Sequence, residues 1–182
     1  ALLGAGYGAV AIATPASTHF EIARQALESG ADVFVEKPMA LDPEEARHLN
    51  GLALEADRIL MVGHLLLYLP AITFMADYLR SGKLGQIYTM HQRRSKLGRV
   101  RAEENVMWSF GVHDVAVLLG LAGEAPTEIQ ASGHAAITPG VEDDTYLHLG
   151  FASGLKAHLH NSWLWPRVER ELIVVGEQGI LV

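Results

Sequence analysis

A lysine that directly follows a short apolar segment is the first residue in this sequence with clear chemical potential. The run Val33-Phe-Val-Glu-Lys-Pro-Met39 predicts a buried parallel strand over residues 32–35, with Lys37 just beyond its carboxyl end. Open parallel sheets bind ligands in the crevice outside those strand ends. A lysine there is desolvated on one side and can act as an acid, a base or a cation that orients a hydroxyl group. Pro38 removes one backbone donor and favours an extended Lys37. The alternative is an ordinary solvated lysine.

Two further segments flank the lysine segment, each separated from it by one predicted helix. They are Val10-Ala-Ile-Ala-Thr-Pro-Ala-Ser-Thr-His19 and Ile59-Leu-Met-Val-Gly-His64. Together the three segments resemble the glucose–fructose oxidoreductase / inositol dehydrogenase / MocA family of nicotinamide-dependent sugar and polyol dehydrogenases. Glu36-Lys37-Pro38 matches that family's signature, and Thr14-Pro15 with His19 matches the turn that accompanies it. The resemblance extends from about Ala9 to the last residue.

The resemblance implies a two-domain dehydrogenase that uses NAD or NADP and oxidises a hydroxyl group of a sugar or nucleotide sugar. In such a reaction Lys37 would orient and polarise the hydroxyl group, and a base would take its proton. Two alternatives stay open. One is an enzyme that oxidises a free polyol or sugar, or reduces a carbonyl group. The other is a non-catalytic member of the family that binds a dinucleotide as a sensor or co-regulator.

His113 is the predicted base, in the segment Trp108-Ser-Phe-Gly-Val-His-Asp114. We expect it in the first turns of a helix, where the positive end of the helix dipole favours a neutral imidazole. The family has a histidine here, usually four residues after an aspartate, but in this sequence Ser109 occupies the aspartate position. Serine can cap a helix but supplies no carboxylate, which favours the sensor alternative. A structural role is the alternative for His113 itself.

The resemblance assigns other residues to cofactor and substrate binding. His64 follows a predicted strand and Tyr68 lies at a helix start, in positions that line the cleft in the family; a packing pair is the alternative. The predicted cofactor-binding residues are Gly4, Gly6, Thr14, Pro15, His19, Glu36, Lys37 and His64. The predicted substrate-binding residues are Lys37, Tyr68, Arg99, Arg101 and His113.

A basic cluster near the middle of an acidic sequence suggests what the substrate carries. Guanidinium groups bind phosphate oxygens two at a time, so the cluster predicts a nucleotide sugar. A solvated loop balanced by Glu103 and Glu104 is the alternative. The cluster comprises Arg93, Arg94, Lys96, Arg99 and Arg101.

The first residues resemble the start of a dinucleotide-binding fold, but their context does not. Gly4, Gly6 and Ala9 have the spacing G-x-G-x-x-A, which requires a helix next, with its amino-terminal end facing a pyrophosphate. Instead the chain passes directly into a predicted strand at Val10. Relative to the family pattern, about two βα units of about 30 residues each are absent near Gly8 and Ala9. We therefore expect residues 1–63 to form an incomplete dinucleotide-binding domain.

Helix and strand signals predict the fold class. Over residues 1–63 they indicate an α/β, Rossmann-type parallel sheet, with a capping box at Thr18 and Glu21 and a second helix start at Asp42. Residues 64–182 are expected to form an α+β domain for substrate binding and oligomerisation, with a predominantly antiparallel open sheet. Its helices are predicted over residues 70–80 and 109–121, and its strands over residues 86–94, 127–137, 144–151, 155–163 and 170–175.

Composition excludes several functional classes. The 182 residues are 49% hydrophobic and 19% charged, which suits a packed core and does not suit disorder. The formal charge of −7 disfavours nucleic acid and anionic membranes as partners. The most apolar run, residues 65–76, is too short to span a bilayer. The absence of cysteine excludes disulfides and thiolate metal sites and fits a reducing compartment, so a cytoplasmic location is expected.

Histidines on the predicted strands point to an interface. His148, His158 and His160 lie on strands, and His158 and His160 share one face by alternation. A histidine pair without a third ligand at a known spacing seldom binds a metal, so no metal site is predicted. Apolar and aromatic side chains over residues 155–165 predict an exposed sheet face, which commonly marks an interface. We expect a homodimer or homotetramer whose interface includes some of His158, His160 and Trp163.

Overall fold

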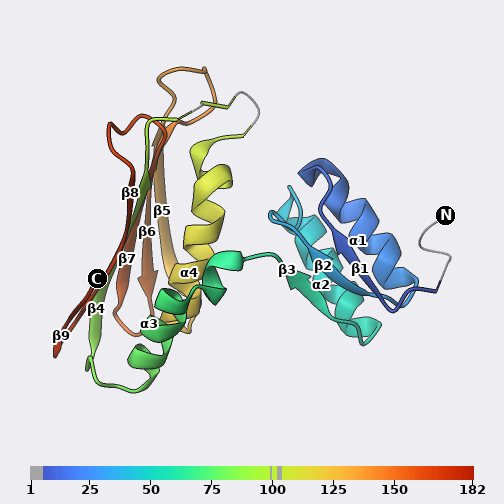
Figure 1. Ribbon diagram of the computed structural model, residues 1–182, viewed down its shortest axis with the longest axis horizontal. Coiled ribbons are helices and arrows are strands. Elements are labelled where there is room, and N and C mark those ends of the chain that lie inside the picture. Colours follow the sequence, from blue (N-terminus) through green and yellow to red (C-terminus); the bar gives the residue numbers. More distant parts are fainter. Residues whose placement is uncertain (1–5, 99, 102–103) are drawn as a thin grey trace. The chain divides into compact units, whose positions relative to one another are not determined.

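The computed structural model of the protein describes residues 6–98, 100–101 and 104–182. Gly4 and Arg99, both named above as binding residues, lie outside these described residues. The chain forms two compact units, divided in the sequence between His64 and Leu65. Each unit has its own sheet, as Figure 1 shows, and its own hydrophobic core.

The first unit is a three-stranded parallel sheet with two helices packed on it. Both helices bury apolar side chains against one face of the sheet, where Leu27 of one helix and Leu49 of the other meet Val35. Phe34 and Met61, which point to the other face, are exposed. The elements are β1 (Ala9–Ile12), α1 (His19–Glu28), β2 (Asp32–Val35), α2 (Pro43–Glu55) and β3 (Leu60–Val62), with the strands in the order β1-β2-β3.

The two helices of this unit begin in different ways. At α2, the Asp42 carboxylate accepts a hydrogen bond at 2.7 Å from a backbone amide of the first turn, as the sequence predicts. At α1, the predicted capping box is wrong, because a 3₁₀ turn, η2 (Ala16–Thr18), precedes the helix and gives Thr18 a helical conformation. The Thr18 hydroxyl instead bonds to the Pro15 carbonyl and the Thr14 hydroxyl, both at 2.7 Å.

The second unit is a six-stranded sheet with the strand order β5-β6-β7-β4-β8-β9. Among the described strands of this second sheet, only β4 and β7 pair in parallel. The predicted fold class, a parallel sheet followed by a predominantly antiparallel one, is confirmed. After a 3₁₀ turn, η3 (Leu65–Tyr68), the elements are α3 (Pro70–Arg80), β4 (Ile87–Ser95), α4 (Val112–Ala122), β5 (Pro126–His134), β6 (Asp144–Phe151), β7 (Lys156–Ser162), β8 (Glu169–Gly176) and β9 (Gly179–Leu181).

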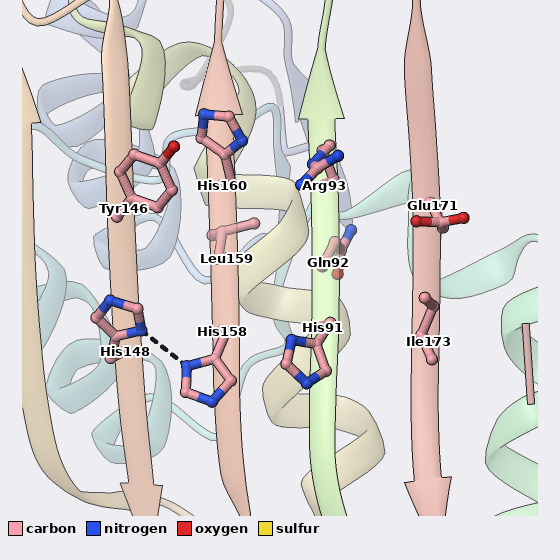
Figure 2. Close-up of a pocket in the computed structure, with 10 residues that line it drawn as sticks. All are labelled: His91, Gln92, Arg93, Tyr146, His148, His158, Leu159, His160, Glu171 and Ile173. Atoms are coloured by element: carbon pink, nitrogen blue, oxygen red, sulfur yellow. Dashed lines mark hydrogen bonds between the residues drawn. The ribbon is translucent and has the colours of Figure 1, made fainter. Parts of the chain in front are cut away.

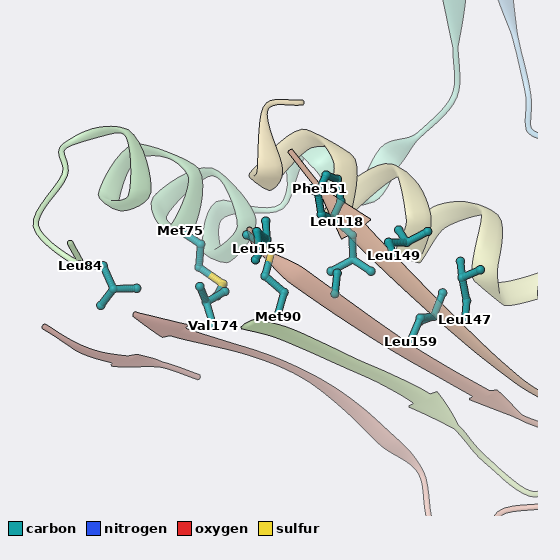
Figure 3. Close-up of a cluster of buried hydrophobic side chains, with 11 residues drawn as sticks. Met75, Leu84, Met90, Leu118, Leu147, Leu149, Phe151, Leu155, Leu159 and Val174 are labelled. Carbon is teal, nitrogen blue, oxygen red and sulfur yellow. The ribbon is translucent and has the colours of Figure 1, made fainter. Parts of the chain in front are cut away.

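Helices α3 and α4 cover one face of this sheet and bury its core, which Figure 3 shows in close-up. Met75 of α3 and Leu118 of α4 pack against inward-facing side chains of the strands, among them Met90 and Leu159. The opposite, outer face carries the side chains that alternate with these. Within the described residues, no helix has both the length and the apolar character that crossing a membrane requires.

Two elements of this unit differ from their predicted bounds by more than one or two residues. The helix predicted from Ser109 becomes α-helical only at Val112, because Met107–Gly111 forms a π-helical turn, η4. The strand predicted to reach Ile137 ends at His134. There the backbone amides of the next residues, including Ile137, donate to the Asp143 carboxylate at 2.9 Å and not to a neighbouring strand.

Candidate functional site

The carboxyl edge of the parallel sheet gathers most of the predicted cofactor-binding residues of the first unit. Thr14 follows β1, Lys37 follows β2 and His64 follows β3. Backbone hydrogen bonds continue the sheet to its very edge, from the Glu36 amide to the Ile12 carbonyl at 2.9 Å and from the Gly63 amide to the Val35 carbonyl at 2.8 Å. The three side chains therefore leave neighbouring strands at one edge of the sheet, which is where open parallel sheets bind ligands.

His19 joins two of the loops at this edge. Its ring lies between two backbone carbonyls, with Nδ1 2.7 Å from the Pro38 oxygen and Nε2 2.8 Å from the Thr14 oxygen. The residue is only 1% exposed. His19 therefore connects the loop after β1 to the residue that follows Lys37, and its contact with a cofactor stays a prediction.

Lys37 and His64 interact electrostatically at the same edge. Both are partly buried, and the Nδ1 atom of His64 is fully buried. Burial, and secondarily the Lys37 cation, lowers the pKa of His64 below its ordinary value. A neutral imidazole is thus kept beside a lysine, which is a pairing able to orient an oxygen atom and accept a proton.

Gly63 allows Glu36 to lie close to this pair. A Cβ atom on Gly63 would lie 3.1 Å from Oε2 of Glu36 and 3.2 Å from the ring of Phe34. The glycine before His64 is therefore explained by the close approach of the Glu36 carboxylate to the backbone. Pro15, by contrast, is exposed in the loop after β1.

In the second unit, His113 is the second residue of α4 and is partly buried, with its Nδ1 atom fully buried. The expected dipole effect is not supported, because the π-helical turn places a full turn of helix before it, and the influence of the helix end fades within the first turn. The true start of this helical segment is held by Asn105, whose side-chain oxygen accepts from the Trp108 amide at 3.0 Å. Ser109, in the π turn, is buried.

Sequence reasoning missed a buried polar network directly beside His113. Asp114 is 0% exposed, and its carboxylate accepts hydrogen bonds from Gln92 and Arg94 of β4 and from Asn161 of β7. Burial raises the pKa of Asp114, and Arg94, Asn161 and Gln92 oppose that rise because each donates a hydrogen bond to the charged form. The sequence did contain one signal of this network, because Gln92 and Arg94 alternate with exposed residues along β4.

The predicted basic cluster is not a single patch. Arg94 points inward to Asp114, whereas Arg93 points to the outer face, where it lies over the Trp165 ring at 5.4 Å and pairs with Glu169 at 3.1 Å. Arg101 is exposed and pairs with Glu104. Tyr68, at the end of η3, is 66% exposed and available to a ligand.

The outer face of the second sheet holds a cavity of about 530 Å³, whose lining includes four histidines and Tyr146 (Figure 2). His148 and His158 face each other with their Nδ1 atoms 2.7 Å apart, and His91 lies beside His158 with ring centroids 4.9 Å apart. His160 stacks on Tyr146 at 4.3 Å. Within the described residues, no group of three or more His, Cys, Asp or Glu side chains is arranged to hold a metal ion.

Trp163 does not belong to this outer face, which corrects one of the predicted interface residues. It is 2% exposed and packs edge-on against Phe110 of the π-helical turn, with ring centroids 6.2 Å apart. The alternation along β7 explains this position, because Trp163 lies two residues after the inward-facing Asn161 and therefore on the face opposite to His158 and His160. Burial lowers the pKa of His158, which does face the cavity, and His91, His148 and Lys156 add to that effect.

Comparison with known proteins finds relatives of both units. Residues 5–64 match the oxidoreductase family with an NAD-binding Rossmann fold, GFO/IDH/MocA, and residues 72–182 match the GFO/IDH/MocA C-terminal domain. UDP-N-acetylglucosamine 3-dehydrogenase of Acidithiobacillus ferrooxidans is 37% identical over 71% of this chain and 41% of its own length. 1,5-Anhydro-D-fructose reductase of Ensifer adhaerens is 30% identical over 96% of this chain and 56% of its own length.

Solved structures agree with these relatives. The structure of UDP-N-acetylglucosamine 3-dehydrogenase GnnA from Acidithiobacillus ferrooxidans has a TM-score of 0.84 and 32% identity, over 97% of this chain and 56% of that chain. This chain therefore spans about half the length of the relatives that it matches.

Proposed function

Because this chain belongs to the GFO/IDH/MocA family of oxidoreductases, we propose that it acts in an NAD- or NADP-dependent dehydrogenase that oxidises a hydroxyl group of a sugar or nucleotide sugar. The observation that carries this proposal is the pair formed by Lys37 and His64 at the carboxyl edge of the parallel sheet. A lysine placed there, with a neutral imidazole beside it, suits the orientation of a hydroxyl group and the movement of its proton.

The residues at this edge fit the nicotinamide end of a dinucleotide. The loop after β1 offers the exposed Thr14 and Pro15, and Lys37 and His64 supply polar groups from the two neighbouring loops. Gly6 has a φ of +72°, and a Cβ atom there would meet no other atom within 4 Å, which is compatible with the close approach of a phosphate. A bound nicotinamide would accept the hydride that leaves the alcohol carbon.

The protein's own contribution to the reaction is to hold the hydroxyl group and take its proton. Lys37 orients the oxygen as a hydrogen-bond donor, which polarises the O–H bond. His113 accepts the proton through Nε2, because its Nδ1 atom is buried. If His113 does not act as the base, His64 is the next candidate, because its lowered pKa keeps it ready to accept a proton.

The substrate class rests on the relatives and on one exposed cation. A relative named UDP-N-acetylglucosamine 3-dehydrogenase supports a nucleotide sugar, and Arg101 is exposed and able to meet a phosphate. Replacing Arg101 with Gln is expected to raise KM for UDP-N-acetylglucosamine a few-fold and to leave KM for free N-acetylglucosamine unchanged. Equal changes for the two sugars would assign Arg101 to the structure of the loop.

The decisive experiment is a turnover assay. The protein is incubated with UDP-N-acetylglucosamine and with NAD⁺ or NADP⁺, and the formation of reduced nicotinamide is followed by fluorescence. Turnover that disappears in Lys37→Ala supports the dehydrogenase. Binding of the dinucleotide without turnover of any sugar in a panel of nucleotide sugars, free sugars and polyols would support the sensor alternative, which the buried Ser109 favours because it supplies no carboxylate beside His113.

We also propose that the outer sheet face joins two or more copies of the chain. It presents Tyr146, His148 and His158 around the cavity, and a patch of this kind commonly marks an interface. Light scattering is expected to give a dimeric or tetrameric mass that falls in Tyr146→Glu. The matched control Phe74→Glu, on the exposed side of α3, should leave the mass unchanged. A monomeric mass for the unmodified protein would exclude this assembly.

A further inference from the structure

The Asp114 carboxylate is the most fully bonded buried group of the described residues that the proposed reaction does not use. Its Oδ1 atom accepts from Gln92 Nε2 at 2.7 Å and from Arg94 Nη2 at 2.7 Å. Its Oδ2 atom accepts from Asn161 Nδ2 at 2.9 Å, and Arg94 Nε lies 2.9 and 3.0 Å from the two oxygens. Two strands thus hold one residue of α4 through three side chains.

This network is poorly explained by stability alone. Burying an ion pair costs desolvation that its attraction barely repays, and well-packed apolar side chains often serve as well. Removing one partner is nevertheless costly, so the network fixes the position of whatever it holds. What it holds is the first turn of α4, where Asp114 directly follows His113.

Asn161 holds the same turn at a second point. Its Nδ2 atom donates to Asp114, and its Oδ1 atom faces Gly111, so that a Cβ atom on Gly111 would lie 2.7 Å from that oxygen. The same Cβ atom would also collide with the sulfur of Met107. Gly111 has ordinary helical angles, φ −61° and ψ −30°, so close contact and not backbone conformation requires glycine here.

His113 lies between these two fixed points. Gly111 and Asp114 are three residues apart and therefore share the face of the helix that rests on the sheet. Successive helical residues turn by about 100°, so His113 points away from that face, one residue round the helix from Asp114. The π-helical turn that ends at Gly111 supports a functional purpose, because such turns occur frequently at functional sites.

We propose that Asp114, Asn161 and Gly111 are positioning residues that fix the direction of the His113 ring without touching the substrate. The proposal rests on the proposed role of His113 as the base. It goes beyond that role by naming the device, built from β4 and β7, that places the ring.

The test compares two glycines of the same helical segment. In Gly111→Ala the new methyl group must displace both the Met107 sulfur and the Asn161 side chain, whereas in Gly120→Ala it meets only the flexible end of Leu67, at 3.1 Å. The full chain is labelled at histidine Cε1, and the His113 resonance is identified by its absence in His113→Gln. We expect Gly111→Ala to shift the His113 resonance and to lower kcat for UDP-N-acetylglucosamine and NAD⁺ by roughly 10- to 100-fold, with KM unchanged. Gly120→Ala should change neither.

A second variant guards against failure of the first to fold. The double variant Arg94→Met with Asp114→Leu removes the ion pair without leaving a buried charge, a replacement that proteins often tolerate. It should broaden or split the His113 resonance, because the ring is no longer held in one direction. An unchanged His113 resonance in a folded variant of either kind would overturn the proposal. The resonance requires no substrate, so a protein without turnover would contradict the proposed function and still allow this test.

Discussion

The edge of the parallel sheet and the start of α4 hold their candidate residues by different means. At the sheet edge, backbone hydrogen bonds and the buried His19 fix the loops around Lys37, and the contacts involve the backbone of residues near it. At α4, the neighbour of His113 is fixed by side chains of strands that lie 20 to 47 residues away in the sequence. The first arrangement leaves a contiguous motif in the sequence, and the second leaves scattered polar residues.

The largest expected effect concerns the sheet edge. Replacing Lys37 with Ala should lower kcat for a productive sugar by about 10²-fold or more, the scale of a positioned acid–base group, while the fold is preserved. Lys83→Ala, a lysine in the turn after α3, serves as the control. Steady-state kinetics measure kcat, and a circular dichroism melt shows whether the fold is preserved. Unchanged turnover in a folded Lys37→Ala protein would remove Lys37 from the reaction.

The second prediction concerns His19, the buried side chain that joins the loops at the sheet edge. His19→Ala removes the ring that lies between two backbone carbonyls and leaves a cavity, so the free energy of unfolding should fall by about 2–4 kcal/mol. The exposed His48 of α2 is the matched control, and His48→Ala should change the free energy of unfolding by about 0.5 kcal/mol or less. Urea denaturation monitored by far-ultraviolet circular dichroism gives the free energy of unfolding of both variants. Equal losses in the two variants would show that His19 does not join the loops.

The smallest expected effect is a shift in one titration. Burial is the main cause of the lowered pKa of His64 and the Lys37 cation is the second, so Lys37→Gln should raise that pKa only part of the way to 6.5. NMR titration of the His64 resonance measures it. An unchanged pKa would mean that the two side chains are not neighbours in solution.

The same shift predicts how acid affects stability. The unfolded chain protonates this histidine near pH 6.5, whereas the folded chain does so only at lower pH, so the contribution of His64 to stability is complete above pH 6.5 and is lost as the pH falls below it. Lys37→Gln should narrow the pH range between the pKa of His64 in the folded chain and its pKa in the unfolded chain. The free energy of unfolding measured at several pH values should therefore fall less steeply with acid in the variant than in the unmodified protein.

The sequence predicted what depends on local patterns. Apolar runs and turn residues predicted both sheets, and the strand ends predicted the edge that gathers Thr14, Lys37 and His64. The Thr18 capping box failed because Pro15 starts a 3₁₀ turn that competes for the same hydroxyl group. The π-helical turn moved the helix start away from His113, and no periodicity distinguishes such a turn from an α-helix.

The Asp114 network was missed for a physical reason. A buried carboxylate requires donors, but the sequence does not state which strands will lie beneath it. Arg93 and Arg94 look equivalent in a basic run, and only the alternation along β4 sends one outward and the other to Asp114. Trp163 was grouped with His158 and His160 although the alternation along the strand places it with Leu159 and Asn161, on the opposite face.

The place of β4 in the second sheet has a consequence for the order of folding. This central strand precedes α4 in the chain but pairs with β7 and β8, so that His91 lies opposite both His158 and Ile173. Strands β5, β6 and β7 can meet as consecutive hairpins, whereas β4 must wait for late parts of the chain, and closing such long loops slows folding. We expect the amides of β6 and β7 to gain protection in pulse-labelled hydrogen exchange before those of β4. The contact of His91 with His158 on the outer face would then form after the contact of His158 with His148.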